Sequence, residues 1–396
     1  MDIKYIDDMT ANFAGKKVLV RFDFNVPLDE NLQITDTTRI DNSLPTIKYL
    51  LEKGTDKLII MSHFGRPKGE RVDKYSLEPV AKYLAEKLDS EVILTESALD
   101  SGINTLLNLS TPKIILLENL RFHPEEEAND AEFAKALAKY GDVLVEDAFG
   151  TAHRKHASTY GIIEYFRNKS FGGFLLKKEI EALDKIVKNP VKPFVAIIGG
   201  AKVSDKIKII SRLITNVDAM IIGGAMAYPF LKAKGHTIGK SLCSDEDVSL
   251  AKQILNSPSG KVKIKLPVDH LVADNLKGKA QYCETADIPP DKMGLDIGEK
   301  TIQIFENTLK DAKTILWNGP MGLFEKPAFA KGTLSIAHMV ADLDAFSLVG
   351  GGDSVAAIKK SGVSDKISHI STGGGASLKY IEEGKLPGIN ALKFGV

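Results

Sequence analysis

Cysteine is almost absent from this chain of 396 residues, which contains only Cys243 and Cys283. Neither cysteine belongs to a Cys-X-X-Cys pair, and no paired histidines stand close to them in the sequence. The pattern therefore argues against a disulfide framework and against a structural zinc site. We expect two buried thiols with a structural role, in a protein of a reducing compartment.

Net charge and long apolar runs are also lacking. The 52 lysines and arginines balance the 52 aspartates and glutamates, which gives a formal net charge of +0. This balance excludes the bulk basic field through which many proteins bind nucleic acids or membrane surfaces. No apolar run approaches the ~18 residues needed to cross a bilayer, and the first residues do not resemble a signal peptide. We therefore expect a cytoplasmic protein without a nucleic-acid or membrane partner.

Arginine is scarce in the second half of the chain. Of the eight arginines, seven precede residue 170 and none follows Arg212, although lysines occur throughout. A guanidinium group binds carboxylates and phosphates through two parallel hydrogen bonds, whereas lysine acts as a mobile point charge. The first half is therefore predicted to bind a small ligand with several negative charges. The second half is predicted to bind its anion through lysines and glycine-rich backbone.

The chain does contain a regular alternation of short apolar runs and helical patterns. This order is typical of an α/β protein, here with two doubly wound, Rossmann-like parallel-sheet domains joined by a long helix and hinge. A length of 396 residues suits two domains better than one. The helix predicted over 174–187 and the following proline pair place the boundary. We expect a first domain over 1–173, a connecting helix and hinge over 174–193, and a second domain over 194–376.

Polar residues follow several predicted strands of the first half. Alternation places Arg21, Asp23 and Asn25 on one face of a strand predicted over 18–27. Arg39 stands in the first turn of a predicted helix, where a cation opposes the helix dipole unless an anion binds beside it. Three more polar loops lie after predicted strands, where open α/β sheets bind ligands, and they cover residues 62–69, 118–123 and 146–156.

Glycines gather in the same way in the second half. Clusters at 199–200, 223–224, 350–352 and 373–375 each follow an apolar, strand-like run. Glycine lets backbone approach a ligand closely, and a helix that begins there points free N–H groups at an anion. We interpret the four clusters as one phosphate-binding site, although a single run of three glycines is equally compatible with a flexible turn.

Three charged residues near these clusters are open to two interpretations. Lys202 and Lys206 are four residues apart, so they are predicted to share a helix face and bind an anion, the alternative being a solvated lysine face. Asp353 is either a helix N-cap or a contact to a metal-bound nucleotide. Trp317, the only tryptophan, is assigned to the core.

Two other classes of protein compete with an enzyme that binds two anions. A dehydrogenase requires Gly-X-Gly-X-X-Gly after its first strand and an acidic residue about 20 positions later, a pattern that no glycine cluster provides. A two-domain binding protein that closes on one anion would not need two separate anion-binding halves. His153 and His156 are interpreted as anion contacts or structural residues rather than as catalysts.

Eight motifs, taken in their order along the chain, resemble those of phosphoglycerate kinases. They are VLVRFDFNVP at 18–27, HFGRP at 63–67, ENLRF at 118–122, DAFGTAHR at 147–154, GGAKVSDK at 199–206, WNGPMG at 317–322, GGGD at 350–353 and STGGGA at 371–376. They occur in the family's order across essentially the whole chain, and eight motifs in register are far more specific than any one of them.

The resemblance implies a monomeric enzyme of glycolysis. It would transfer a phosphoryl group reversibly from 1,3-bisphosphoglycerate to ADP, giving 3-phosphoglycerate and ATP, with Mg²⁺ as cofactor. The resemblance assigns the phosphoglycerate site to Asp23, Phe24, Asn25, Arg39, His63, Phe64, Gly65, Arg66, Arg121 and Arg154. It assigns the nucleotide site to Lys202, Lys206, Gly223, Gly224, Gly294, Glu325, Gly351, Gly352, Asp353 and Ser354, with Asp353 also contacting the metal. It assigns the transferred phosphoryl group to Arg39, Lys202, Gly373 and Gly374, and it implies that a tail over 377–396 returns to the first domain.

Three residues depart from the family pattern. Phe64 stands where leucine is usual, Lys155 where alanine is usual, and Lys292 where bacterial members usually carry tryptophan. None of these changes removes a group that the chemistry needs, because transfer to an already ionised oxygen requires positioning and charge stabilisation rather than a general base. Since water must be kept from the acyl phosphate, we also expect the two domains to close when both ligands are bound.

Overall fold

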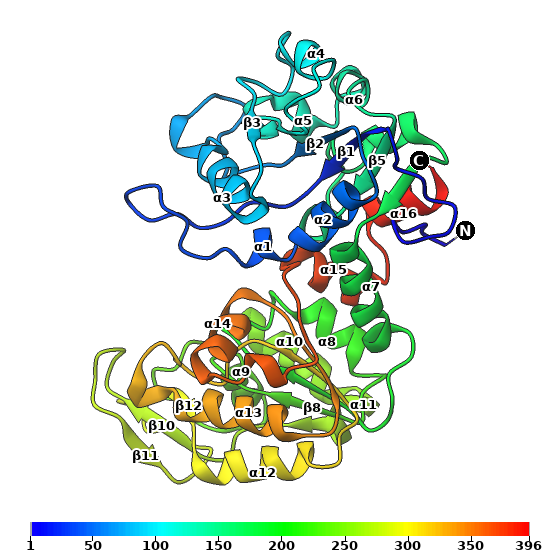
Figure 1. The fold of residues 1–396 in the computed structure, drawn as a ribbon. Coiled ribbons are helices and arrows are strands. Elements are labelled where there is room, and N and C mark those ends of the chain that lie inside the picture. The colour runs from blue at the N-terminus through cyan, green and yellow to red at the C-terminus, as the bar shows by residue number, and fades with distance from the viewer. Residues whose placement is uncertain (1, 396) are drawn as a thin grey trace. The chain divides into compact units, whose positions relative to one another are not determined.

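The computed structural model describes residues 2–395, and these residues divide into two compact units (Figure 1). Unit 1 contains the residues up to Glu181 and those from Lys385 onward, and unit 2 contains Ala182–Gly384. The change from unit 1 to unit 2 falls inside helix α7 (Phe174–Val187), where the sequence placed the connecting helix. Residues 377–384 lie in unit 2, whereas the tail was expected to belong to the first domain from 377 onward.

Unit 1 is built on a six-stranded sheet in which all strands are parallel. The strand order is β3 (Val92–Leu94), β4 (Ile114–Leu116), β2 (Lys57–Met61), β1 (Lys17–Arg21), β5 (Val143–Glu146) and β6 (Ser170–Gly172). Strands β2, β3 and β4 lie on one side of β1, and β5 and β6 lie on the other. This is the doubly wound arrangement that the sequence predicts. The loops after β1, β2 and β5 therefore meet at the switch point where such sheets bind ligands.

Alternate residues of the central strands pack into two separate hydrophobic cores, one on each face of the sheet. Val18 and Val20 pack with α2 (Leu44–Glu52) and α3 (Glu78–Leu88), whereas Leu19 packs on the other face with α6 (Ala131–Ala138). Both faces are covered, as expected for a parallel sheet whose strands read as continuous apolar runs. Because fully burying an aliphatic side chain contributes about 1.5–3 kcal/mol, these two cores hold the loops of the switch point in place.

Strand β1 ends at Arg21, so the strand predicted over 18–27 is wrong beyond that residue. Phe22 and Phe24 are both fully buried and stack with ring centroids 5.3 Å apart. The Phe24 N–H donates to the Ser62 hydroxyl at 2.9 Å instead of to a neighbouring strand. The segment after β1 thus crosses the end of the sheet, because it finds hydrogen-bond partners in the loop after β2.

Unit 2 contains a second six-stranded parallel sheet. Its order is β15 (His369–Ile370), β14 (Phe346–Val349), β13 (Thr314–Asn318), β7 (Phe194–Ile198), β8 (Ala219–Ile222) and β9 (Ile264–Lys265). An antiparallel sheet of β11 (Gln281–Cys283), β10 (His270–Ala273) and β12 (Met293–Ile297) is added to it, and the sequence did not predict this sheet. Trp317 is fully buried in the core, as predicted, and its Nε1–H donates to the Gly319 carbonyl at 2.8 Å.

The helices of unit 2 follow its strands. They include α8 (Ile207–Leu213), α9 (Ala227–Ala233), α10 (Asp245–Asn256), α11 (Pro258–Lys263), α12 (Glu299–Leu309), α13 (Lys331–Asp342), α14 (Gly352–Ser361) and α15 (Gly375–Glu383). Because α8 begins only at Ile207, the prediction that Lys202 and Lys206 share a helix face is wrong. Asp247 of α10 accepts the Ser204 N–H at 2.8 Å, and this contact holds the segment in a turn.

Two further expectations concern the thiols and the chain ends. Cys243 and Cys283 are free and half-buried, so the expectation of two buried thiols is wrong. Helix α16 (Pro387–Phe394) lies in unit 1 near the N-terminal segment (Figure 1), where the Gly388 N–H donates to the Ala152 carbonyl at 2.9 Å. No helix among residues 2–395 has both the length and the apolar character needed to cross a membrane.

Asp147 attaches the first turn of α7 to the unit 1 sheet. It directly follows β5, is fully buried, and its Oδ1 accepts the Leu176 N–H at 2.8 Å, while Thr46 Oγ1 accepts the Phe174 N–H at 3.0 Å. These contacts occupy N–H groups that have no partner inside the helix. Burial raises the pKa of Asp147 to about 7, although the hydrogen bonds from Leu176 and Thr46 act in the opposite direction.

We predict that Asp147→Asn makes unit 1 progressively more stable, relative to the wild type, as pH rises from 4 to 7. An aspartate in the unfolded chain releases its proton near pH 3.9, whereas folded Asp147 keeps it until about pH 7. Across this window the free energy of unfolding of the wild type therefore falls by about 1.4 kcal/mol per pH unit. The Asp147→Asn variant does not show this loss. Pulsed hydrogen exchange in urea, followed on peptides of β1 and β5, measures the difference. Asp56→Asn, at an exposed position of the same unit, is the control, and parallel pH curves for both variants would contradict the prediction.

Candidate functional site

Each unit carries one group of site-like residues at the carboxyl edge of its parallel sheet. The group in unit 1 consists of arginines, histidines and amide side chains in the loops after β1, β2, β4 and β5. The group in unit 2 consists of glycine loops after β7, β8, β13 and β14. The two groups therefore differ in chemistry.

Four arginines of unit 1 surround His63. Burial first, and then the charges of Arg21, Arg121, Arg39 and Arg154, hold the pKa of His63 well below its ordinary value of 6.5. The ring is 4% exposed and therefore neutral at pH 7. A neutral imidazole among several cations leaves their charge uncompensated, so the arrangement favours an anionic ligand.

Asp23 and Asn25 join the loop after β1 to two neighbouring elements. Asp23 Oδ2 accepts from Arg39 Nη1 at 2.8 Å, and Asp23 Oδ1 lies 3.8 Å from His63 Nδ1. The Asn25 carbonyl also accepts from Arg39 Nη1, at 3.2 Å, while Asn25 Oδ1 accepts the Gly65 N–H at 2.8 Å. Arg39 lies in the short helix α1 (Thr38–Asp41). Its guanidinium is therefore held in place while one third of its side chain stays exposed.

Gly65 is the residue on which the loop after β2 turns. Its φ is +58°, and a Cβ at this position would lie 2.3 Å from the Tyr75 ring, so only glycine fits. Its carbonyl accepts from Arg121 Nη1 at 2.8 Å. Asn119 binds both the N–H and the carbonyl of Phe64, at 3.0 and 2.7 Å. Burial lowers the pKa of Arg121 to about 10, which leaves it charged at pH 7.

Four predicted phosphoglycerate-site residues differ in burial. Phe24 and Phe64 are buried, 0% and 3% exposed, so their side chains belong to the core and only their backbone is near the loops. Arg66 is exposed and has no hydrogen bond or ion pair with the described residues. Arg154 is half-buried and its Nε donates to His153 Nε2 at 3.2 Å. These two arginines keep most of their donors available for a ligand.

Glu126 and Ser158 belong to the same region but were not assigned from the sequence, which interpreted the neighbouring His156 as an anion contact or a structural residue. His156 is 8% exposed, and its Nδ1 is buried without a hydrogen-bond partner in the part of the chain that the structure describes. Burial, together with nearby arginines, lowers its pKa to about 3. Glu126 belongs to a run of three glutamates, which predicts a solvated helix face, so no local pattern reveals that its carboxylate points inward.

In unit 2 the glycine loops pack against one another. A Cβ on Gly199 would lie 2.1 Å from the Pro320 carbonyl oxygen, and a Cβ on Gly224 would lie 2.7 Å from backbone atoms of Gly200. The loops after β7, β8 and β13 therefore touch at the switch point, and side chains at these positions would separate them. Of the four predicted glycine clusters, those at 199–200 and 223–224 therefore meet here, together with the loop after β13.

The loop after β14 joins this group through side chains. The Asn318 Nδ2 donates to the Gly350 carbonyl at 2.7 Å, and the Ser354 hydroxyl accepts the Gly319 N–H at 2.6 Å. A Cβ on Gly351 would lie 2.7 Å from Asn318 Nδ2. The first turn of α14 is thereby fixed beside the β13 loop.

Lys206 ties two of these loops together. Its Nζ donates to the Gly199 carbonyl at 2.7 Å, to the Asn318 carbonyl at 3.0 Å and to Asn318 Oδ1. The side chain is half-buried, which excludes a fully solvated lysine for this residue. Burial lowers its pKa to about 8, partly opposed by the charges of Asp353 and Asp205.

The remaining nucleotide-site residues differ in exposure. Lys202, Glu325 and Asp353 are exposed, and Asp353 does not cap α14, because Gly351 holds the N-cap position. The N-cap interpretation of Asp353 is therefore wrong, and the contact to a metal-bound nucleotide stays a proposal. Gly352 is exposed beside Gly351 in the same turn.

Gly223, Gly294 and Gly374 lie in three different settings. A Cβ on Gly223 would lie 2.4 Å from Met321 Sδ, so Gly223 belongs to the packed loops. Gly294 lies on β12, where a Cβ would lie 2.2 Å from the Tyr228 hydroxyl. Gly374, which follows Gly373 before α15, has φ +51° and open space where a Cβ would stand.

The donor set in unit 2 fits a magnesium ion held mainly by a ligand. Among residues 2–395 there is no group of three or more histidine, cysteine, aspartate or glutamate side chains that could hold a metal. Magnesium in nucleotide sites is bound through one or two carboxylates together with substrate phosphates. A single exposed carboxylate beside glycine loops, as at Asp353, is compatible with that mode of binding.

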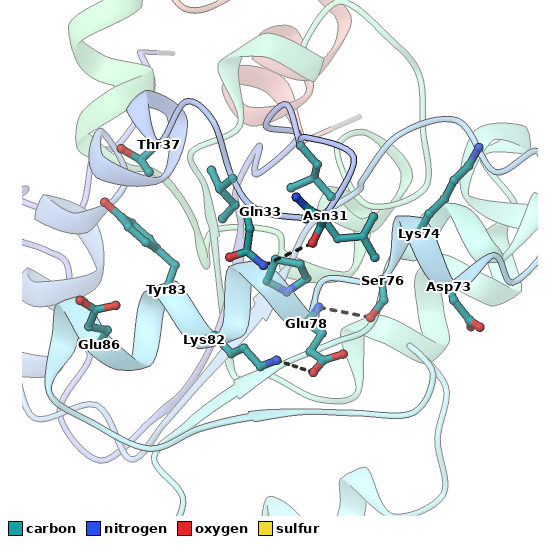
Figure 2. Close-up of a pocket in the computed structure, with 14 residues that line it drawn as sticks. Asn31, Gln33, Thr37, Asp73, Lys74, Ser76, Glu78, Lys82, Tyr83 and Glu86 are labelled. Carbon is teal, nitrogen blue, oxygen red and sulfur yellow. Dashed lines mark hydrogen bonds and ion pairs between the residues drawn. The ribbon is translucent and has the colours of Figure 1, made fainter.

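A separate cavity of about 450 Å³ lies in unit 1 between the loop over 28–37 and helix α3 (Figure 2). Its charged lining mixes acids and lysines, and Lys82 is paired with Glu78 at 2.7 Å. None of the arginines around His63 lines it. A smaller cavity of about 290 Å³ shares Leu28 and Leu32 with it and reaches Gly65. The larger cavity therefore lies beside the candidate anion site and is not part of it.

The chain is similar to known proteins along nearly its whole length. The family model for phosphoglycerate kinase matches residues 6–385. Phosphoglycerate kinase of Borrelia garinii is 50% identical over 397 residues, which cover 99% of this chain and 100% of that protein. Phosphoglycerate kinase of Acidobacterium capsulatum is 52% identical over 394 residues, which cover 96% of this chain and 97% of that protein.

Solved structures agree with this similarity. The structure of phosphoglycerate kinase from Coxiella burnetii has a TM-score of 0.87 and 40% identity, and the match covers 97% of each chain. The structure of phosphoglycerate kinase from Pyrococcus horikoshii OT3 has a TM-score of 0.81 and 33% identity, with 99% of this chain and 98% of that chain covered.

We predict that ADP affinity falls by about tenfold between pH 7 and pH 9. In the free protein the Lys206 ammonium loses its proton near pH 8, whereas bound phosphates favour the charged form, so binding weakens above the pKa of the free protein. Isothermal titration calorimetry over this range measures the effect, and Lys206→Met should bind weakly at every pH. Lys208→Met, at an exposed position two residues later, is the control. A wild-type affinity that stays constant over the range would contradict the prediction.

Proposed function

The chain belongs to the phosphoglycerate kinase family, and we propose that its two units divide the two substrates between them. Its activity is the reversible transfer of a phosphoryl group from 1,3-bisphosphoglycerate to ADP, giving 3-phosphoglycerate and ATP in glycolysis. Unit 1 binds the phosphoglycerate and unit 2 binds the nucleotide. The observation that carries this division is the contrast between the arginines around neutral His63 and the packed glycine loops.

The phosphoglycerate carries a carboxylate or acyl phosphate at one end and a phosphate at the other. Arg121, Arg154 and the exposed Arg66 bind the phosphate that is not transferred, because their planar donors match its oxygens. Asp23, Asn25 and neutral His63 bind the hydroxyl and carboxyl groups, to which they offer both donors and acceptors. Phe24, Phe64 and Gly65 contribute to the phosphoglycerate site through their backbone and their packing.

The nucleotide phosphates bind to the glycine loops of unit 2. Gly351, Gly352 and Ser354 present the first turn of α14, whose N–H groups favour anions. Gly223, Gly224 and Gly294 place closely packed backbone near the base, and Glu325 binds the nucleotide. Asp353 would hold Mg²⁺, which supplies charge neutralisation at the phosphate oxygens when it is bound.

The transferred phosphoryl group requires charge stabilisation rather than a general base, because the accepting oxygen is already ionised. Lys202 is exposed and has no hydrogen bond or ion pair with the described residues that would have to be broken. Gly373 and Gly374 lead into the N-terminus of α15. The backbone N–H groups at a helix N-terminus point out of the helix and favour an anion there. Together with Arg39, these groups stabilise the negative charge of the transition state.

The enzyme works as a cytoplasmic monomer without nucleic-acid or membrane partners. Each proposed substrate site is formed by residues of one chain, and the formal net charge is +0. Sedimentation velocity at assay concentrations would show a single species of 43.1 kDa, and a dimer under those conditions would contradict the monomeric state.

We predict that Arg154→Lys weakens 3-phosphoglycerate binding by about 1.5–3 kcal/mol and leaves ADP binding unchanged. Lysine keeps the charge but loses the planar, two-point contact to phosphate. Isothermal titration with each ligand separately measures both affinities. Arg167→Lys, at an exposed surface position of the same unit, is the matched control. Equal weakening of both ligands would contradict the division of substrates between the units.

Lys202→Ala is expected to lower kcat by roughly 10²–10⁴ while leaving the fold and the ADP affinity intact, because it removes a charge that acts on the transition state. A coupled assay of ATP formation gives kcat, and calorimetry gives the affinity. Lys208→Ala serves as the control for a lysine change in the same segment. A loss of tenfold or less would show that Lys202 is an ordinary surface lysine.

Closure of the two units is expected when both substrates are bound. The reacting atoms must come within ~3–3.5 Å, and only the two ligands together supply contacts that favour a closed form. Small-angle X-ray scattering should therefore give a smaller radius of gyration with 3-phosphoglycerate and nucleotide together than with either alone. An active enzyme whose radius of gyration does not change would contradict closure.

A further inference from the structure

A buried chain of hydrogen bonds connects helix α5 (Pro124–Ala128) with His63. Both oxygens of the Glu126 carboxylate accept from Ser158, Oε1 from the hydroxyl at 2.6 Å and Oε2 from the N–H at 3.0 Å. The Ser158 hydroxyl in turn accepts from Arg21 Nε at 2.8 Å. At the other end of the guanidinium, Arg21 Nη2 lies 3.2 Å from His63 Nδ1. Glu126, Ser158 and Arg21 are all 0% exposed.

The direction of each hydrogen bond in this chain follows from chemistry. A guanidinium group has donors only, so both Ser158 Oγ and His63 Nδ1 must accept from Arg21. Ser158 Oγ then has its own hydrogen available for Glu126. A neutral imidazole that accepts at Nδ1 carries its hydrogen on Nε2. The buried contacts therefore select the tautomer of His63.

The Nε2 of His63 is the ring atom that remains available. It has no hydrogen-bond partner among residues 2–395, and it is not one of their fully buried atoms without a partner. This N–H therefore reaches solvent from the ring whose other nitrogen, Nδ1, lies 3.8 Å from Asp23 Oδ1, and the phosphoglycerate ligand is proposed to bind there.

Glu146 is another acidic residue near Arg21, but it does not hold the Arg21 guanidinium. Glu146 is paired with Arg21 in the sheet register, but its Oε1 accepts the Ala148 N–H and its Oε2 has no partner within the described chain. Burial raises the pKa of Glu146 to about 8, so it is largely protonated at pH 7. Glu126, through Ser158, is therefore the carboxylate that reaches Arg21 by hydrogen bonds.

We propose that Glu126 and Ser158 are positioning residues of the phosphoglycerate site. They hold the Arg21 guanidinium so that His63 keeps its hydrogen on Nε2 and donates it to the ligand. The proposal rests on the proposed function in one respect, the assignment of His63 to phosphoglycerate. Neither Glu126 nor Ser158 touches the ligand. Their effect is transmitted because the Ser158 hydroxyl is the acceptor of the buried Arg21 Nε, and Glu126 holds that hydroxyl in place.

The direct test is the tautomer of His63 in the free enzyme. Nitrogen-15 NMR of the histidine-labelled protein distinguishes the two tautomers, and His63→Gln identifies the His63 signals. The wild type should show the hydrogen on Nε2. Glu126→Gln and Ser158→Ala should show a mixture, because Arg21 no longer has a fixed position. Glu125→Gln, an exposed neighbour on the same helix, should match the wild type. Circular dichroism confirms that each variant is folded, and Ser158→Ala provides the test if Glu126→Gln does not fold.

Kinetics in the direction of ATP consumption supply the second readout. The KM for 3-phosphoglycerate should rise about tenfold in Glu126→Gln and Ser158→Ala, the effect of losing one well-placed hydrogen bond to a charged group. The KM for ATP and kcat should stay unchanged, as expected when binding is lost equally in the ground and transition states.

The two readouts separate the possible failures. A wild-type His63 with its hydrogen on Nδ1, or an unchanged tautomer in Glu126→Gln and Ser158→Ala, would overturn the positioning role and leave the proposed function intact. A changed tautomer with an unchanged KM for 3-phosphoglycerate would overturn the assignment of His63 to the ligand, and the proposal with it.

Discussion

Positive charge collected at the end of the unit 1 sheet is the constraint on which the rest of that unit depends. Arg21 is completely buried and Arg121 nearly so, and removing such groups from water costs several kcal/mol each unless partners replace the water. The chain supplies some partners itself, through Glu126 by way of Ser158 and through the Gly65 carbonyl. We propose that an anionic ligand supplies the rest.

The neutral state of His63 follows from the same constraint. Burial and four neighbouring cations keep its pKa low. A proton added to this ring would be a fifth positive charge in the same small volume. The histidine therefore serves as a hydrogen-bond donor and acceptor rather than as an acid or base. This agrees with a reaction in which the accepting oxygen is already ionised and positioning does most of the work.

The proposed nucleotide site of unit 2 is built in a different way. Its arginine content is low, and the glycine loops instead bring backbone N–H groups and one half-buried lysine together at the switch point. Glycine is required there because the loops touch one another, as the contact of Gly199 with the Pro320 carbonyl shows. A carbonyl-bound Lys206 holds this assembly closed without a buried carboxylate. Such a site suits a ligand that brings its own metal ion.

The two parallel sheets could be predicted from the sequence because their strands are short apolar runs that alternate with helical periodicity. The antiparallel sheet could not, since β11 is largely exposed and carries no such run. The arginine and glycine loops were found because residue type and position after a strand are local signals. Glu126 and Ser158 were missed because their pairing joins residues 32 positions apart, and only the folded chain brings them together. For the same reason the turn at Lys202, which Asp247 stabilises, was predicted as helix.

The central claim is that each unit binds one substrate through its own chemistry. Hydrogen exchange measured by mass spectrometry, with 3-phosphoglycerate alone and with Mg²⁺ and ADP alone, tests it most directly. The account predicts that 3-phosphoglycerate slows exchange in peptides that contain residues 23–25, 63–66 and 119–121, and leaves the glycine loops unchanged. It predicts that ADP slows exchange at 199–206 and 350–354 and leaves the arginine loops unchanged. Protection of the glycine loops by 3-phosphoglycerate, or equal protection of both units by either ligand, would contradict it.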